Sequence, residues 1–103
     1  MFVKTQSLSR AALQNPPSQI ILDVRSAEEF AQAHVPGARN IPVHELKQRH
    51  SELGSDKNVR IVVYCRSGAR SATAARALAE LGFTQIQDIG PMSRWAPQSA
   101  GTT

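Results

Sequence analysis

Residues 65–71, Cys-Arg-Ser-Gly-Ala-Arg-Ser, combine a nucleophile with features that favour negative charge. Cys65 is the sole cysteine, and it lies between an apolar run and an Ala- and Leu-rich segment, so we expect a strand-to-helix loop here. Backbone N–H groups of such a loop point at one spot, and Gly68 allows the backbone to curl. Arg66 and Arg70 add positive charge. Such surroundings lower a thiol pKa from about 8.5 to roughly 3.5–7.5, which predicts a reactive thiolate rather than an inert buried cysteine.

The remaining residues of this stretch are expected to help hold an anion. A cation at Arg70 opposes the dipole of the helix that it begins, so anion binding explains it better than surface solvation does. The hydroxyls of Ser67 and Ser71 are further donors, although Ser71 is equally interpreted as a plain helix N-cap. The backbone of Ala69 completes the predicted loop.

Two polar residues outside the loop are candidates for catalysis or for structural support. Asp23 ends an apolar run and is either a general base or an acceptor that ties loops together with Arg25. We favour the second interpretation because buried carboxylates are normally paired. His34 precedes a turn, and we likewise favour a partly buried structural histidine over a catalytic one.

The elements that must position these residues alternate along the chain. Strands are predicted at residues 20–24, 39–41, 59–64 and 83–89, with an edge strand at 3–5, and helices at residues 7–13, 26–33, 43–53 and 71–81, with one helical turn at 91–95. Ser26 with Glu29 three residues later predicts a capping box at the start of the second helix, and Gly54 is the expected C-cap of the third. Alternation of this kind predicts an α/β fold with a mainly parallel sheet and helices on both faces. Ligands bind outside the carboxyl ends of such strands, where Cys65 falls.

Length and composition limit the possible classes of protein. With 103 residues, the chain is expected to form one domain over residues 1–96, followed by a flexible tail at 97–103. One cysteine excludes an internal disulfide, and the three histidines lack the spacing of a zinc site. No membrane span or signal peptide is recognised, so we expect a cytoplasmic protein. The net charge of +4 favours anionic partners, but the basic residues are scattered, which disfavours nucleic-acid binding.

The loop sequence resembles the active-site loop of rhodanese-domain proteins. The N-terminal signature of that family is similar to Asp23-Val24-Arg25, Glu29-Phe30, residues 34–38 (His-Val-Pro-Gly-Ala) and Asn40-Ile41-Pro42, and its C-terminal signature is similar to Gly90 with Trp95. The resemblance covers residues 20–95. This chain departs from the pattern at Ala33 and Pro91, where the family usually has glycine.

The resemblance implies a five-stranded, mainly parallel sheet and a sulfurtransferase activity. Cys65 would take a sulfane sulfur from an anionic donor such as thiosulfate and form a persulfide. The backbone amides of residues 66–70 would hold the transferred sulfur, and cyanide, a thiol or a partner protein would then remove it. No metal or organic cofactor is implied. A partner protein or a tRNA-modification pathway is left open as the physiological context.

Three rival functions remain. Cysteine phosphatases and arsenate reductases have a similar loop, but with five residues between Cys and Arg, whereas four separate Cys65 from Arg70. The shorter loop makes a smaller cradle and disfavours phosphate. A non-catalytic binding module is disfavoured by the retained cysteine. A redox sensor would need an external thiol to resolve a sulfenic acid, because the chain has no second cysteine.

Overall fold

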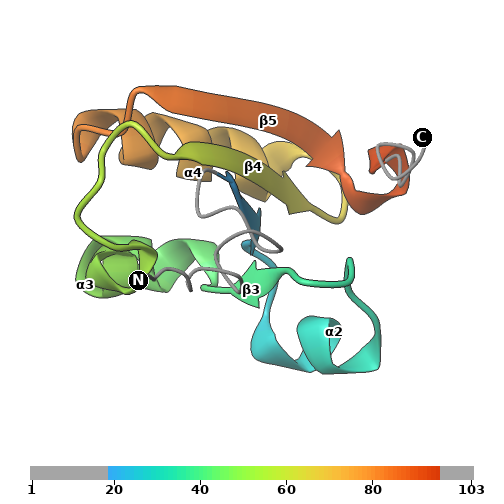
Figure 1. Cartoon of the computed structure of the whole chain (residues 1–103). Helices are drawn as coiled ribbons and strands as arrows, with labels where there is room; N and C mark the ends of the chain where they lie inside the picture. Colours follow the sequence, from blue (N-terminus) through green and yellow to red (C-terminus); the bar gives the residue numbers. More distant parts are fainter. Residues whose placement is uncertain (1–18, 96–103) are drawn as a thin grey trace, which may run out of the picture.

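The computed structural model describes residues 19–95, which form a parallel sheet beside three helices (Figure 1). Its strands are β2 (Gln19–Asp23), β3 (Arg39–Asn40), β4 (Arg60–Cys65) and β5 (Gln85–Pro91), in the order β3-β2-β4-β5. The α/β class and the parallel sheet are therefore confirmed. The expected edge strand at 3–5, the helix at 7–13 and the tail at 97–103 lie outside the described residues, so the predicted fifth strand stays a prediction.

The central strand β4 supplies the middle of the hydrophobic core. Its side chains alternate between two faces, and five of its six residues are buried, as a continuous apolar run predicts. Ile61, Val63 and Cys65 point to one face, and each is 0% exposed. The helices pack on this same face, through Leu46 and Leu78 among others.

Three α-helices are present in the described residues. They are α2 (Ala27–Gln32), α3 (Leu46–Arg49) and α4 (Ala69–Glu80), and 3-10 turns at Val43–Glu45 (η1), His50–Leu53 (η2) and Met92–Arg94 (η3) accompany them. α2 begins with the predicted capping box, in which Ser26 and Glu29 bond each other's backbone N–H groups. The helix predicted over residues 43–53 is thus one turn of α-helix between two 3-10 turns, and it ends at Gly54 as expected.

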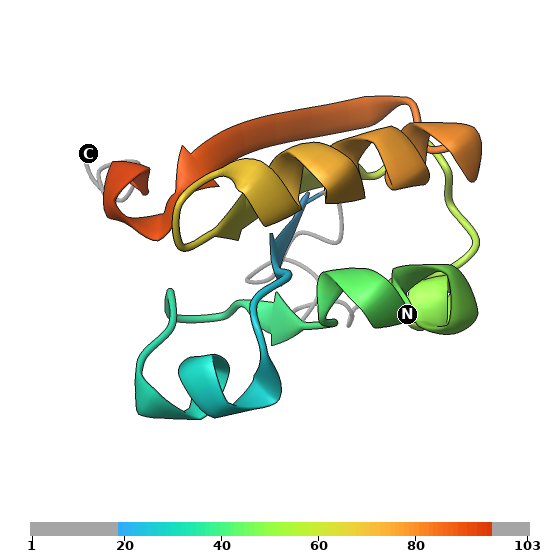
Figure 2. The same ribbon diagram turned by 180° about the vertical axis from the view of Figure 1, so that it is seen from behind.

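α3 and α4 lie on one side of the sheet and contact each other (Figure 2). α2 contributes no buried residue and lies at the end of the sheet where β4 and β5 finish, as does η3 (Figure 1). Among residues 19–95, no helix is long and apolar enough to cross a membrane.

Two predicted boundaries near the loop are wrong. α4 begins at Ala69 rather than Ser71, because Gly68 takes a positive φ of 109° and serves as the N-cap without a side chain. β5 runs to Pro91 instead of stopping before Gly90, because one extra residue shifts the register between Val63 and Tyr64. Pro91 therefore lies opposite Cys65 in the sheet.

Candidate active site

Cys65 is the last residue of β4, at the carboxyl end of the sheet where a ligand site is expected. Its thiol is buried, and its sulfur accepts the backbone N–H of Gly68 at 2.9 Å. This contact is possible because the chain turns back within three residues through the left-handed conformation of Gly68. The thiol sulfur therefore lies directly before the N-terminus of α4.

Hydrogen-bond donors of the loop lower the pKa of the Cys65 thiol below its ordinary value. Burial acts in the opposite direction and is the largest single influence, because it disfavours the charged thiolate. It is outweighed by the donors of Ser71, through hydroxyl and backbone, and by the backbone N–H groups of Gly68 and Ser67. The arrangement therefore makes the Cys65 thiol easier to ionise than an ordinary cysteine, and the predicted reactive thiolate stays a prediction.

Ser71 is fully buried in the first turn of α4 and is not its N-cap, because Gly68 occupies that position. Its hydroxyl donates to the carbonyl oxygen of Gly68 at 3.1 Å. A hydroxyl has one proton, so donation to the Cys65 sulfur requires rotation away from that carbonyl. Ser71 can thus support either the loop backbone or the thiolate.

The arginine charges are arranged differently from the prediction. The Arg70 guanidinium is bound by the Glu29 carboxylate, with Nη1–Oε1 at 2.7 Å and Nη2–Oε2 at 3.2 Å. Arg66, Ser67 and Ala69 are exposed at the surface of the loop. Neither arginine is among the main causes of the lowered Cys65 pKa, so the loop donors replace them in that role.

Asp23 is the centre of a buried polar cluster on the other face of the sheet. Its carboxylate accepts from Arg25 through the backbone N–H at 2.9 Å and through Nη2 at 2.7 Å, and from the Tyr64 hydroxyl at 2.7 Å. Tyr64 in turn accepts the Val35 N–H at 3.1 Å. The Asn40 amide donates to the carbonyl oxygens of Asp23 and Arg25, both at 3.0 Å. These contacts tie β2, β3 and β4 to the loop after α2, and they leave the Asp23 oxygens occupied by donors.

Reasoning from the sequence missed three interactions of the site: the hydrogen bonds of the Tyr64 hydroxyl, those of the Asn40 amide, and the pairing of Glu29 with Arg70. Tyr64 carried a usable signal, because a phenol near the end of a buried strand needs a hydrogen-bond partner. The sequence showed Glu29 only as a member of the capping box and of the family signature, because its partner Arg70 is 41 residues away.

His34 lies apart from these groups. It is exposed, so the prediction of a partly buried residue is wrong. Its ring stacks on Phe30, with centroids 3.7 Å apart, and Nδ1 is 2.7 Å from the Phe30 carbonyl oxygen. Because a carbonyl only accepts, Nδ1 carries the hydrogen in this contact. His34 thus satisfies a carbonyl at the end of α2.

The two departures from the family pattern have different surroundings. Pro91 borders the loop, because a Cβ atom at Gly68 would lie 4.0 Å from the Pro91 Cδ and 3.9 Å from the Gly90 Cα. Ala33 is exposed, and its carbonyl oxygen accepts from the Arg25 guanidinium. Pro91 is therefore the departure that touches the candidate site.

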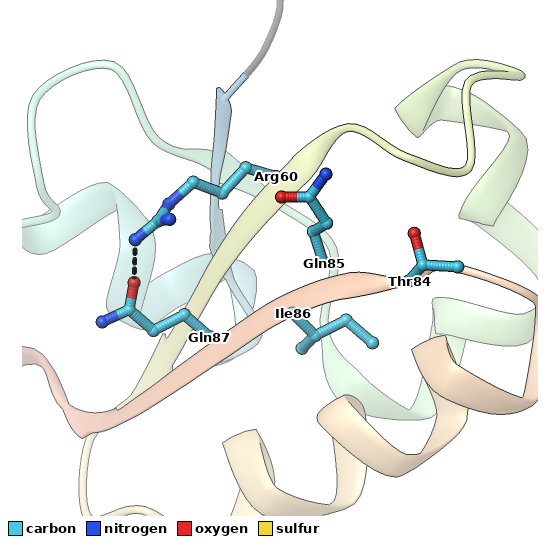
Figure 3. A pocket seen from close by; sticks show the side chains of 5 residues that line it. All are labelled: Arg60, Thr84, Gln85, Ile86 and Gln87. Atoms are coloured by element: carbon cyan, nitrogen blue, oxygen red, sulfur yellow. Dashed lines mark hydrogen bonds between the residues drawn. The ribbon is translucent and has the colours of Figure 1, made fainter.

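A shallow hollow at the opposite end of the sheet has no connection with Cys65. It has a volume of about 210 Å³ and is lined by Arg60, Thr84, Gln85, Ile86 and Gln87. Figure 3 shows the Arg60 guanidinium bonded to the Gln87 side chain across the first residues of β4 and β5. Arg60 begins the strand that Cys65 ends, so this hollow is about 17 Å from the thiol, from the rise of a strand.

Comparison with known proteins agrees with this arrangement of strand, loop and helix. Residues 5–96 match the rhodanese-like domain family. The chain belongs to this family. A solved structure described as a rhodanese with anions from E. coli superposes with a TM-score of 0.71 and 38% identity, covering 76% of this chain and 92% of that one.

Two curated relatives are named for sulfur transfer. Thiosulfate sulfurtransferase PspE of Escherichia coli is 42% identical over 69 residues, which are 67% of this chain and 66% of PspE. A sulfurtransferase of Allochromatium vinosum is 35% identical over 95 residues, 91% of this chain and 86% of that protein. Across PspE and two Bacillus subtilis relatives, the match spans 66%, 59% and 39% of the relatives' own lengths.

Proposed function

We propose that this protein is a sulfurtransferase that carries a sulfane sulfur as a persulfide on Cys65. The observation that supports this most directly is the Cys65 sulfur at the carboxyl end of β4, accepting the Gly68 N–H at 2.9 Å with a lowered thiol pKa. A thiolate held in this way is a nucleophile toward sulfur. The sulfurtransferase names of PspE and of the Allochromatium relative agree with the proposal.

With thiosulfate as donor, the cycle has two displacements. The Cys65 thiolate attacks the outer sulfur of thiosulfate, a new S–S bond forms, the original S–S bond breaks, and sulfite leaves with the electron pair. A thiophilic acceptor such as cyanide then attacks the outer sulfur of the persulfide. Thiocyanate leaves, and the Cys65 thiolate is restored. A thiol or a protein thiol replaces cyanide in the same step, and neither step needs a metal or an organic cofactor.

The loop residues have binding roles in this proposal. The backbone N–H groups of Arg66, Ser67, Gly68, Ala69 and Arg70 hold the outer sulfur and the negative charge that develops on it. They are suited to this because they belong to the loop and the first turn of α4, next to the Cys65 sulfur.

Four further residues support the loop. Asp23 and Arg25 fix the chain beside β4, Ser71 fixes the Gly68 carbonyl, and His34 fixes the end of α2. We assign all of this to one domain over residues 1–96, followed by a short tail.

The decisive experiment is intact-mass measurement of the purified protein before and after thiosulfate, with Cys65→Ser as the control. We expect the wild type alone to gain the mass of one sulfur atom and to lose it to cyanide as thiocyanate. An unchanged wild-type mass, with Cys65 still open to alkylation at neutral pH, would exclude thiosulfate as the donor. A gain of sulfur in Cys65→Ser would refute the role of Cys65.

A further inference from the structure

The ion pair between Glu29 and Arg70 joins α2 to the first turn of α4. The two side chains meet through both guanidinium Nη atoms, as a bidentate pair, and are 23% and 37% exposed. Bidentate pairs of this kind are stronger and more directional than single contacts. Arg70 lies in the first turn of α4, directly after the loop whose Gly68 N–H bonds the Cys65 sulfur, so Glu29 places a negative charge at the edge of the candidate active site.

Glu29 is held in this position from both sides. Its Oε1 accepts the Ser26 N–H at 2.9 Å as well as Nη1 of Arg70, and its own N–H donates to the Ser26 hydroxyl at 3.1 Å. The carboxylate cannot move away without losing its bond to the Ser26 N–H, which is one of the two bonds of the capping box. Hydrogen bonding from Arg70 first, and from the Ser26 backbone second, lowers the Glu29 pKa to about 2, so it is charged at neutral pH.

The Arg70 charge acts on two negative groups. Its pKa is raised by the hydrogen bonds to Glu29 first, against burial, and then by the charges of Glu29 and Cys65. The Arg70 charge therefore acts on Cys65 while its guanidinium is bonded to Glu29. A carboxylate that already neutralises the cation weakens its attraction for an incoming anion.

We infer that Glu29 is a positioning residue that sets which donors the Cys65 site accepts, by restraining the charge of Arg70. Glu29 makes the site disfavour dianions such as thiosulfate relative to donors of lower charge, such as the persulfide of a small thiol or of a protein. The naming of sulfur donors rests on the proposed function. The restraint of Arg70 itself does not, because it acts on any anion that approaches the thiolate.

The test uses three reagents that react with the same sulfur and differ in charge. Iodoacetamide is neutral and iodoacetate is a monoanion of similar size. Both form a carbon–sulfur bond to the thiolate with loss of iodide. Thiosulfate is a dianion and delivers sulfur with loss of sulfite. Cys65 is the sole cysteine, so intact mass follows all three reactions at one site.

Glu29→Gln is the informative variant, and Glu28→Gln is its matched control. Glutamine is accepted at this position of a capping box, so Glu29→Gln keeps the cap and removes the charge. Glu28 is the neighbouring residue in the same first turn and is exposed, and its replacement removes an equal charge that Arg70 does not contact. For each protein, the rates with iodoacetate and with thiosulfate are divided by its rate with iodoacetamide. This ratio cancels any change in the ionised fraction of Cys65 and in the access of reagents to its sulfur.

For Glu29→Gln we expect this ratio to rise about threefold for iodoacetate and about ninefold for thiosulfate, since Coulomb energy is proportional to the charge of the reagent. Both effects should shrink in about 1 M salt, where the Debye length is near 3 Å. Glu28→Gln should leave both ratios close to the wild type.

The outcomes separate this inference from the proposed function. Equal ratios in the two variants, or a loss of thermal stability in Glu29→Gln without any dependence on reagent charge, would make Glu29 a structural tether and overturn the inference. A rise for iodoacetate, with no sulfur loading from thiosulfate in any protein, would support the restraint of Arg70 and reject thiosulfate as donor.

Discussion

Replacing Tyr64 by phenylalanine removes one buried hydroxyl and two hydrogen bonds. The hydroxyl donates to Asp23 at 2.7 Å and accepts from the Val35 N–H at 3.1 Å, and the side chain is 0% exposed. A hydrogen bond to a charged group contributes about 1.5–3 kcal/mol, and a buried N–H left without a partner costs about 1–3 kcal/mol. We expect Tyr64→Phe to lower the free energy of unfolding by about 2.5–6 kcal/mol at pH 7, a large part of the roughly 5–15 kcal/mol typical of a domain.

The loss of stability in Tyr64→Phe should depend on pH, and this dependence identifies the Tyr64 hydroxyl as its cause. Burial first, and then the neighbouring Asp23, raise the pKa of Tyr64 from 10.0 to about 12. Because the folded pKa is above the unfolded one, the stabilisation is complete below pH 10 and disappears as the pH rises through 12. A shift of this size corresponds to about 3 kcal/mol. The difference between wild type and Tyr64→Phe should therefore shrink by about that amount between pH 10 and 12.

Urea unfolding followed by circular dichroism, at pH values from 7 to 12, measures this difference. Tyr64 is the sole tyrosine, so phenolate absorbance reports its ionisation directly. Thr84→Val is the control, because the Thr84 hydroxyl also lies within hydrogen-bonding distance of two groups but is exposed. It should cost under about 1 kcal/mol, with no change in the alkaline range. Phenolate absorbance rising near pH 10 while the protein remains folded would refute the reasoning.

Three further predictions concern the loop and its ion pair. Gly68→Ala and Gly54→Ala both place a side chain at a positive φ, of 109° and 92° respectively, so each should lower the free energy of unfolding in urea by about 1–3 kcal/mol. Only Gly68→Ala should slow sulfur loading, as followed by intact-mass measurement. Arg70→Gln should slow sulfur loading from thiosulfate while the melting temperature stays close to that of the wild type. Arg76→Gln, at an exposed position of the same helix, should change neither the loading rate nor the melting temperature. Because the Glu29 pKa is lowered from 4.5 to about 2, the stability that Glu29 contributes is present above pH 4.5 and lost as the pH falls toward 2. The stability difference between wild type and Glu29→Gln should vanish in that range, and a difference that persists at pH 2 would contradict the ion pair.

Local patterns predicted the parts of the fold that depend on neighbouring residues. The capping box of Ser26 and Glu29 and the buried strand before Cys65 both appear where expected, because a short segment contains all the groups involved. The start of α4 was misplaced because Ser71 looks like an N-cap, whereas the positive φ of Gly68 begins the helix two residues earlier than predicted.

Features that depend on contacts between residues far apart in the chain could not be predicted from short segments of the sequence. Gly90 and Pro91 normally break a strand, but the neighbouring strand β4 and an extra residue in β5 keep them in the sheet. The pairing of Glu29 with Arg70 depends on how α2 sits against α4, which no short window of sequence specifies. The same holds for the bond from Tyr64 to Val35.

The absence of buried residues in α2 affects how this protein can diverge. Exposed positions of a helix tolerate most substitutions within about 0.5 kcal/mol, so Ala27, Glu28, Ala31 and Gln32 can drift without approaching the threshold for unfolding. These positions flank the residue that contacts Arg70. Selection can therefore reshape the surface beside the Cys65 loop while the hydrophobic core stays unchanged. Paralogues with different sulfur acceptors should accumulate their differences here first, ahead of any change in the loop that begins at Cys65.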